Sequence, residues 1–387
     1  MKKSVALLVE SPFSERDYQR FGVVTLQREF DVSILDLTSW LKPRVWKNLS
    51  HTTFAPPNYR PISTAEQCRA DLRANRYLFA FDYLSTSAKA NSVRGELKRL
   101  GIARITVSTG LVPTLPRRNV FKQLASLKYR TNKLAVLISW IRKLILARCR
   151  ITLTPEFAVV TGTASLHDPA IRDAKKIWAH SPDYDIFLDV GRRSQHPNNA
   201  YAVYADEDCA FHPDFLHDNI KPFVRPESFY PALMHFFREF EEKSGLAVII
   251  AAHPRSRWED RSELLEGREA VKGKTAELMA GAALVFAHAS TSISFAVLSR
   301  VPLVFLTSDE MDNSFYRDEV RMRSEVFSAP LINIDHFGDE ECRAAAVAGV
   351  DGHAYEDYRE RYIKKSGTQD IPLWDIIVSQ IGAQKFP

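Results

Sequence analysis

The sequence predicts an α/β protein made of two Rossmann-like domains that face each other across a cleft. The chain has 387 residues, of which 45% are hydrophobic, 26% charged and only 15 glycine, so its composition is globular and its length suits two domains. Short apolar runs alternate with amphipathic helical patterns, and such alternation builds a parallel sheet covered on both faces. The alternation starts again after about residue 200, which predicts a second sheet.

The first domain is predicted to contain six strands. They are expected at residues 5–9, 32–35, 78–81, 103–107, 158–161 and 176–179. Amphipathic helices are expected between several of them, at 15–29 and 65–74. The polar, non-periodic stretch 192–199 indicates a domain boundary, so we expect the first domain to span residues 1–195.

The second domain, expected at 196–354, shows the clearer alternation. Its strands are expected at 201–205, 247–251, 284–287 and 303–306, and its helices at 226–242, 275–280 and 293–299. Residues 355–387 contain two further helical patterns, 355–364 and 373–381, which we expect to pack back across the cleft. Because ligands of such sheets bind at the carboxyl ends of the strands, the residues that follow each strand are the first functional candidates.

The spacing of the cysteines and the shortness of the apolar runs favour a cytoplasmic location. The chain contains four cysteines, Cys68, Cys149, Cys209 and Cys342. Their spacing fits neither a disulfide framework nor a structural zinc site, which favours a reducing compartment. The apolar run that begins at Ser4 ends at Glu10, so it is shorter than the core of a signal peptide, and no run of about 18 uncharged apolar residues occurs. We therefore expect a cytoplasmic protein.

Polar groups that bind phosphate follow the strand predicted at 247–251. His253, Pro254 and Arg255 come directly after it. Histidine and arginine at a sheet edge can donate hydrogen bonds to phosphate oxygens, and arginine can do so in a bidentate way. A solvated loop with no ligand is the alternative for this tripeptide taken alone.

A second phosphate-binding pattern follows the strand predicted at 284–287. Ser290, Thr291 and Ser292 open the next predicted helix, where free backbone N–H groups and the helix dipole favour an anion. One hydroxyl suffices for the N-cap, so three exceed what the helix needs. With the tripeptide at His253, they predict a two-sided clamp for a nucleotide phosphate.

The sequence Gly273-Lys274-Thr275 ends like a P-loop but lacks its pattern. Arg268 stands where the first glycine of the motif is required, with Gly267 one residue out of register, and no strand precedes the motif directly. We therefore reject an ATPase, interpret Thr275 as an N-cap and expect Lys274 near the cleft as a further phosphate contact.

The His-Pro pair and the Ser/Thr pair resemble the donor-site motifs of bacterial sialyltransferases and capsular Kdo transferases. Those proteins are GT-B glycosyltransferases that use CMP-activated ulosonic acids. The chain also resembles an uncharacterised group of surface-polysaccharide-cluster proteins. That likeness is carried by residues 10–18, 211–214, 252–255, 273–278 and 288–294. The acidic Asp/Glu-Asp-Gly motif of the sialyltransferases has no full match, because Asp189-Val190-Gly191 is only a partial one.

The resemblance implies an enzyme that transfers a Kdo-like or sialic-acid-like sugar from CMP to a glycan acceptor. It places the chain in lipopolysaccharide or capsule synthesis, with the first domain on the acceptor side and the second binding the nucleotide sugar. We expect no cofactor besides the donor and no metal, since the clamp supplies positive charge, although Asp183-Tyr184-Asp185 imitates a metal-binding Asp-X-Asp motif. The donor sugar, the acceptor and the anomeric outcome stay open.

Sugar transfer needs a carboxylate that takes the proton of the acceptor hydroxyl. Asp183 and Asp185 follow the last strand of the first domain, Asp206 and Glu207 follow the first strand of the second, and Glu10 ends the first strand of the chain. These five residues are the candidates for the base, and the sequence leaves the choice among them open.

Positive charge is concentrated in one segment. Residues 97–155 contain 13 lysines or arginines and no acidic residue, whereas the whole chain has a net charge of only +5. Within it, 134–148 is an apolar stretch with basic residues on one side, which is typical either of a helix at an anionic membrane surface or of a buried helix with a solvated end. The residues alone leave the two open, but the resemblance favours the membrane, because acceptors of surface-glycan transferases are often attached to lipid. We therefore expect the basic segment 117–150 to bind the inner face of the plasma membrane. Only Phe121, Tyr129 and Trp140 offer aromatic stacking in this segment, which argues against RNA.

Other functions also fit a phosphate clamp. A CDP-glycerol-type phosphotransferase and a UDP-sugar transferase need the same contacts, because the clamp does not identify the base of the nucleotide. A non-catalytic module that binds nucleotide or glycan is the alternative from another class, and it would lack turnover.

Overall fold

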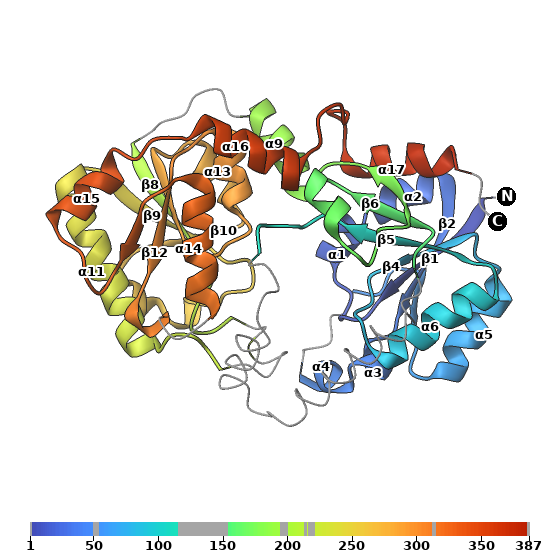
Figure 1. Ribbon diagram of the computed structural model, residues 1–387. Helices are drawn as coiled ribbons and strands as arrows, with labels where there is room; N and C mark the ends of the chain where they lie inside the picture. The colour runs from blue at the N-terminus through green and yellow to red at the C-terminus, as the bar shows by residue number, and fades with distance from the viewer. Residues whose placement is uncertain are drawn as a thin grey trace. The chain divides into compact units, whose positions relative to one another are not determined.

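The computed structural model describes residues 2–48, 54–114, 154–193, 200–212, 215, 221–311 and 315–384. The chain forms two compact units (Figure 1). Unit 1 comprises Met1–Leu111, Leu146–Asp185 and Arg361–Pro387, and unit 2 comprises Val112–Ile145 and Ile186–Glu360. The division therefore falls at Asp185 rather than at the polar stretch 192–199, and the chain returns to unit 1 at its C-terminal end.

Unit 1 contains a seven-stranded parallel sheet in the order β3-β2-β1-β4-β5-β6-β7. Its strands are β1 (Lys3–Val9), β2 (Phe30–Asp36), β3 (Tyr59–Pro61), β4 (Phe79–Asp82), β5 (Ala103–Ser108), β6 (Phe157–Val160) and β7 (Lys175–Trp178). All six predicted strands are present, and the edge strand β3 is additional. The central strands are buried apolar runs, as expected for a sheet covered on both faces.

Helices cover both faces of this sheet. The helices of unit 1 are α1 (Glu15–Arg20), α2 (Val23–Glu29), α3 (Thr38–Leu41), α4 (Pro43–Asn48), α5 (Ala65–Asn75), α6 (Ala88–Arg99), the short η2 (Thr163–His167) and α17 (Leu373–Gly382). On one face α5 and α6 bury Leu72, Val93 and Leu97, and on the other α2 and α17 pack together over the sheet (Figure 1). The helix α9 (Pro182–Arg193) begins in unit 1 and continues into unit 2.

The predicted helix 15–29 is wrong in one respect, because the structure has two helices there. The chain breaks between α1 and α2 at Gly22, which has a left-handed conformation with φ of 59°. A Cβ at this position would lie 2.0 Å from Cγ of Trp374 in α17, so only glycine fits. The break is thus caused by a residue about 350 positions away, which the local pattern does not show.

Unit 2 contains a six-stranded parallel sheet in the order β10-β9-β8-β11-β12-β13. Its strands are β8 (Tyr201–Ala205), β9 (Ala247–Ala252), β10 (Ala270–Lys272), β11 (Leu284–Ala287), β12 (Leu303–Thr307) and β13 (Leu331–Asn333). The four predicted strands occupy the centre, and the edge strands β10 and β13 are additional. Two parallel-sheet α/β units are therefore confirmed.

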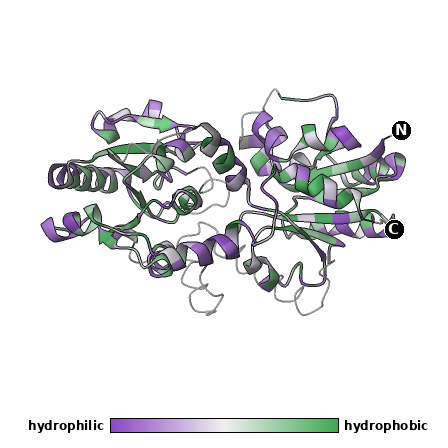
Figure 2. Cartoon of the chain, turned by 90° about the horizontal axis from the view of Figure 1, so that it is seen from above, coloured by the Kyte–Doolittle hydropathy of each residue, from purple (hydrophilic) through white to green (hydrophobic). Residues whose placement is uncertain are grey.

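The helices of unit 2 also lie on both faces of its sheet (Figure 1). They are α11 (Pro226–Ser244), α12 (Thr275–Ala280), α13 (Ile293–Ser299), α14 (Phe315–Phe327), α15 (Asp339–Ala346) and α16 (Gly352–Tyr358), with short turns η3 (Trp258–Asp260), η4 (Ser262–Leu265) and η5 (Asp309–Met311). The phenylalanine face of α11 packs with α15 in one apolar core, and α16 contacts α13 and α14. Figure 2 shows hydrophobic strands inside each unit and mixed, amphipathic colouring on the covering helices.

Three local predictions need correction. Strand β10 ends at Lys272, directly before Gly273, where no strand was expected, although Arg268 still stands where a P-loop needs its first glycine. Lys274, not Thr275, is the N-cap residue of α12, and its side chain makes no capping hydrogen bond. The pattern at 355–364 corresponds to α16 followed by the single π-type turn η6 (Arg359–Ile363).

The membrane predictions are tested only in part. Among the residues that the structure describes, no helix combines the length and apolar character needed to cross a membrane. The basic segment 117–150 lies outside the described residues.

Candidate functional site

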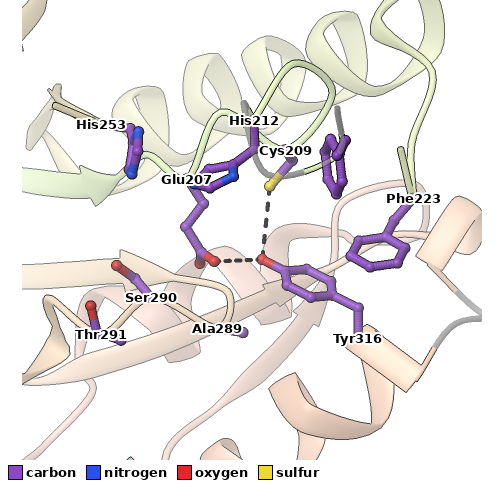
Figure 3. Close-up of a pocket in the computed structure, with 10 residues that line it drawn as sticks. Glu207, Cys209, His212, Phe223, His253, Ala289, Ser290, Thr291 and Tyr316 are labelled. Atoms are coloured by element: carbon purple, nitrogen blue, oxygen red, sulfur yellow. Dashed lines mark hydrogen bonds between the residues drawn. The ribbon is translucent and has the colours of Figure 1, made fainter. Parts of the chain in front are cut away.

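A cavity of about 280 Å³ opens at the carboxyl edge of the unit 2 sheet (Figure 3). It is lined by Glu207, Cys209, His212, Phe215, Phe223, His253, Ala289, Ser290, Thr291 and Tyr316. These residues follow β8, β9 and β11 or belong to the first turn of α14. Parallel strands present their carboxyl ends at one edge, and this is why segments far apart in the sequence meet here.

Glu207 is the acidic residue of this cavity. Tyr316 donates a hydrogen bond from its hydroxyl to Oε2 of Glu207 at 2.7 Å (Figure 3). Oε1 of Glu207 is buried and has no hydrogen-bond partner among the described residues. Burial raises the pKa of Glu207 to about 7, although the Tyr316 hydroxyl and the positive charge of Arg323 oppose the shift. A carboxyl group with a pKa near neutrality can both take up and release a proton at physiological pH.

Asp206, the neighbouring candidate, has a different environment. Its carboxylate accepts hydrogen bonds from the backbone N–H of Asp208 and of His253 and from Nε1 of Trp258, at 2.8, 3.2 and 2.7 Å. Its side chain is buried and does not line the cavity. Asp206 therefore fixes the start of the loop that carries His253.

Two histidines lie side by side on one wall of the cavity. The ring centroids of His212 and His253 are 4.7 Å apart, and Nη2 of Arg255 lies 3.5 Å from Nε2 of His212. The backbone N–H of Arg255 donates to Nδ1 of His253 at 3.3 Å, which orients the His253 ring. Imidazole and guanidinium groups this close together can bind one anion between them.

Hydroxyl groups form the opposite wall. Oγ of Ser290 lies 2.7 Å from Oγ of Ser292 and also accepts the backbone N–H of Ser292 at 3.2 Å. Thr291 is exposed and lines the cavity with Ser290 (Figure 3). Ser292 is the N-cap residue of α13, but its side chain makes no capping bond. Of the residues predicted to bind phosphate, His253 from one strand end and Ser290 and Thr291 from another thus line one cavity, whereas Ser292 does not.

The third wall is aromatic, and the sequence did not predict it. Phe223 and Tyr316 are stacked, with centroids 5.0 Å apart and an interplanar angle of 19°, and Phe215 meets Phe223 edge-on at 5.5 Å. Sγ of Cys209 lies 3.9 Å from the Tyr316 hydroxyl. Such a wall can bind the flat face of a base or the apolar face of a sugar.

Several predicted site residues lie elsewhere. Lys274 is exposed at the start of α12 and, like Pro254 and Arg255, does not line the cavity. His288, which precedes the serines, is a core residue that contacts the Leu306 carbonyl oxygen and the Tyr204 hydroxyl, and burial lowers its pKa to about 4.

The other three acidic candidates belong to unit 1. Asp183 and Asp185 lie in the first turn of α9 rather than in a loop. Asp185 accepts the backbone N–H of Leu373 at 2.9 Å and thereby holds the start of α17. Glu10 is buried, pairs with Lys42 at 2.8 Å and accepts the Ser85 hydroxyl at 3.1 Å.

A metal is not assigned to any of these residues. Within the described part of the chain, no three or more His, Cys, Asp or Glu side chains are placed to hold a metal ion together. Metal independence stays a prediction.

Comparison with known proteins shows the fold. No protein-family model matches the chain, and no curated protein matches its sequence. The calicheamicin glycosyltransferase CalG4 is 13% identical, with a TM-score of 0.52 over 99% of both chains. The glycotransferase of kitacinnamycin is 16% identical, with a TM-score of 0.52 over 98% of this chain and 99% of that one.

A third solved structure comes from a different kind of enzyme. The UDP-GlcNAc 2-epimerase from Methanocaldococcus jannaschii is 12% identical, with a TM-score of 0.50 over 99% of this chain and all of that chain. Together these likenesses show that the chain has the two-domain α/β fold of GT-B glycosyltransferases.

Proposed function

We propose that the protein is a glycosyltransferase that binds a nucleotide-sugar donor in the unit 2 cavity and transfers the sugar to a hydroxyl acceptor. One observation carries the proposal. The cavity combines two histidines and two hydroxyls with a carboxyl group whose pKa is about 7, at the edge of the sheet where ligands of this fold class bind. The GT-B fold supports the same conclusion.

The donor phosphate would lie between His253 and the hydroxyls of Ser290 and Thr291. Negative charge grows on the phosphate oxygens as the bond to the sugar breaks. Hydrogen bonds from imidazole N–H and from hydroxyl groups stabilise that charge without a metal ion. This charge is larger in the transition state than in the bound donor, so the same groups stabilise the transition state more. The protein holds them in place before the reaction starts, so no reorganisation is needed.

Glu207 is the carboxylate that we assign as the general base. It is the acidic side chain that lines the cavity, and its raised pKa suits proton uptake from an alcohol near neutral pH. The other four candidates, Asp206, Asp183, Asp185 and Glu10, do not line the cavity. Asp206 and Asp185 hold backbone N–H groups, and Glu10 is paired with Lys42.

The donor and the acceptor are proposed from the resemblance stated for the sequence. A CMP-activated ulosonic acid would be the donor, a surface glycan the acceptor, and the cytoplasmic face of the membrane the place of reaction. The product would enter lipopolysaccharide or capsule, and no cofactor besides the donor would be needed.

Turnover of a donor panel tests the proposal. The protein is incubated with CMP-, UDP- and GDP-activated sugars, and the released nucleotide is measured by liquid chromatography and mass spectrometry. One donor is expected to turn over, and Glu207→Gln is expected to lower that rate by about 10²–10⁴-fold while donor affinity is retained. Glu10→Gln and Asp185→Asn are the comparison variants. If they lose turnover and Glu207→Gln does not, the base is assigned wrongly.

A sugar-nucleotide epimerase is the second candidate, because the Methanocaldococcus enzyme shares the fold at a similar TM-score. The same assay separates the two. An epimerase changes the configuration of the sugar of its donor, whereas a transferase forms a new glycosidic bond to an acceptor.

A further inference from the structure

The two histidines of the cavity come from different loops. His212 ends the β8 loop (206–212), which follows β8, and His253 begins the β9 loop (253–261), which follows β9. Their rings are nevertheless only 4.7 Å apart. Groups that bind one ligand together work well only when they are held within about 0.5 Å of the productive geometry. The spacing of the two rings therefore depends on how the two loops are fixed to each other.

The β8 loop contains a turn with a strained backbone. Asp208 has a left-handed conformation, with φ of 52°, which persists in a residue other than glycine only when the surroundings hold it. The backbone N–H of Phe211 closes the turn by donating to the carbonyl oxygen of Asp208 at 2.9 Å. Cys209 lies within this turn and His212 follows it directly, and both line the cavity. A change in the turn therefore moves two residues of the cavity wall.

Arg261, the last residue of the β9 loop, holds this turn. Its Nη1 donates a hydrogen bond to Oδ1 of Asp208 at 3.3 Å, and the Asp208 side chain is only 1% exposed. Cζ of the same guanidinium group lies 3.9 Å from the centre of the Phe211 ring. A planar guanidinium group can make both contacts at once, because it pairs with a carboxylate through its edge and stacks on a ring through its face. Arg261 thus contacts both residues that the hydrogen bond of the turn joins.

Arg261 is itself anchored in the β9 loop. Its backbone N–H donates to the carbonyl oxygen of Trp258 at 3.0 Å, and its Cζ lies 5.4 Å from the centre of the Trp258 ring. Trp258 is buried and donates Nε1 to Asp206 at 2.7 Å, and Asp206 also accepts the backbone N–H of His253. The two loops are therefore joined at two places, by Asp206 near His253 and by Arg261 next to the turn that precedes His212.

We propose that Arg261 is a positioning residue, which sets the distance between His212 and His253 by tying the turn of the β8 loop to the β9 loop. Arg261 does not line the cavity, so it acts through Asp208 and Phe211. The proposal rests on the proposed function in one respect, because that function gives the two histidines a phosphate to share. Loss of the guanidinium group removes the ion pair and the ring contact together, and the strained turn is then free to relax.

The ring resonances of the two histidines test the proposal without any ligand. The protein is labelled with ¹³C in histidine, and the His212 and His253 resonances are identified by their absence in His212→Gln and His253→Gln. Each ring shields the protons of its aromatic neighbour according to the distance between them, so the chemical shifts report the spacing of the rings. Arg261→Met is expected to shift the His212 resonance, and an unmoved His212 resonance would overturn the proposal. Phe211→Leu gives the same test if Arg261→Met fails to fold, since it removes the ring on which the guanidinium group stacks.

Arg268→Met is the matched control. The side chains of Arg268 and Arg261 are both 18% exposed, and Arg268 likewise pairs with a carboxylate, Glu241 at 2.6 Å, and lies near a ring, with Cζ 5.7 Å from the centre of Phe237. Its loss is expected to lower the free energy of unfolding without moving the His212 resonance. An equal shift of that resonance in Arg268→Met would overturn the proposal, because any destabilising change would then have the same effect.

Nucleotide binding supplies a second readout, with CMP and UDP as the probes. Arg261→Met is expected to weaken binding about tenfold, which is the contribution of one hydrogen bond to a charged group. In the His212→Gln background the same change is expected to have little further effect, because the two changes act through one contact and are not additive. Additive losses would overturn the proposal. The resonances decide it even if neither probe binds, and that outcome would count against the proposed function alone.

Discussion

Three consecutive acidic residues after β8 have three different environments. Asp206 accepts three N–H groups and fixes the His253 loop, whereas Glu207 faces the cavity. Asp208 has a φ of 52° and lies 3.3 Å from Nη1 of Arg261, and burial raises its pKa to about 6. Composition cannot separate these roles, because they depend on which way each side chain points from the strand end.

The raised pKa of Glu207 predicts a specific pH dependence of stability. The folded pKa is about 7 and the ordinary value is 4.5, so the folded protein holds this proton more tightly than the unfolded chain. The free energy of unfolding therefore falls as the pH rises from about 4.5 to about 7, by about 3 kcal/mol at most. Glu207→Gln lacks this titration, so we expect a smaller loss between pH 5 and pH 8. Urea denaturation of the unchanged protein and of the Glu207→Gln variant at pH 5 and pH 8 measures the free energy of unfolding.

The exposed Glu277→Gln is the control for that measurement and is expected to behave like the unchanged protein. An equal loss of stability in the Glu207→Gln variant would show that the carboxyl group does not titrate in this range.

His212 provides a second prediction at this scale. Its ring lies 4.7 Å from that of His253, so we expect it to contact the same phosphate. His212→Gln should weaken nucleotide binding about tenfold, which is the contribution of one hydrogen bond to a charged group. Calorimetric titration measures the change, with the exposed His235→Gln as control. Unchanged affinity in His212→Gln would limit the clamp to His253 and the hydroxyls.

The sequence predicted four of the cavity residues that lie close to strand ends, and it missed the aromatic ones for a physical reason. His253, Ser290, Thr291 and Glu207 come within a few residues of a strand end, so the fold class alone brings them to one edge. Phe223 and Tyr316 reach the cavity from a loop and a helix, and only tertiary packing brings them there. Asp183, Asp185 and Glu10 also follow strands, yet they belong to unit 1.

At the scale of elements, the three strands that the sequence did not predict are all at sheet edges. β3, β10 and β13 have three residues each and are only partly buried. Edge strands are covered less than central ones, so they lack the continuous apolar run that marked the others. The nine inner strands were predicted because burial on both faces leaves that run in the sequence, and β7 is the one edge strand of the described sheets that was also predicted.

The break between α1 and α2 predicts the effect of a small substitution. Gly22→Ala places a Cβ against the Trp374 ring and forces alanine into a left-handed conformation. We expect a loss of stability of about 2 kcal/mol or more, visible as a lower thermal midpoint. A Cβ at Gly95 in α6 would have no atom within 4 Å, so Gly95→Ala should raise the stability of the protein slightly instead. Equal effects of the two changes would show that the approach of Trp374 is not a constraint.

At the scale of the whole molecule, the two units have separate apolar cores. The core of unit 1 includes Leu373, Trp374 and Ile377 from the last helix, and the core of unit 2 is centred on the phenylalanines of α11. Unit 1 therefore depends on three stretches of the chain, the last of them after all of unit 2. A sequence pattern locates the helix α17 but does not say against which sheet it packs.

Ile377→Ala tests this division of the cores. Ile377 is fully buried in unit 1, so truncating its side chain should lower the free energy of unfolding of that unit by about 2–5 kcal/mol. Hydrogen exchange is expected to become faster in β1 and β4 and to stay unchanged in β8 and β11. The exposed Val24→Ala in the same unit is the control. Faster exchange in both sheets would mean that the units do not unfold separately.

The binding of nucleotides by calorimetry tests the central claim most directly. CMP, CDP, UMP, UDP and GDP are titrated into the unchanged protein and into the double variant Ser290→Ala/Thr291→Ala. The account predicts saturable binding of at least one nucleotide to the unchanged protein, and a loss of about 1.5–3 kcal/mol of binding free energy in a double variant that stays folded. No binding of any nucleotide, or equal affinity in the two proteins, would contradict it.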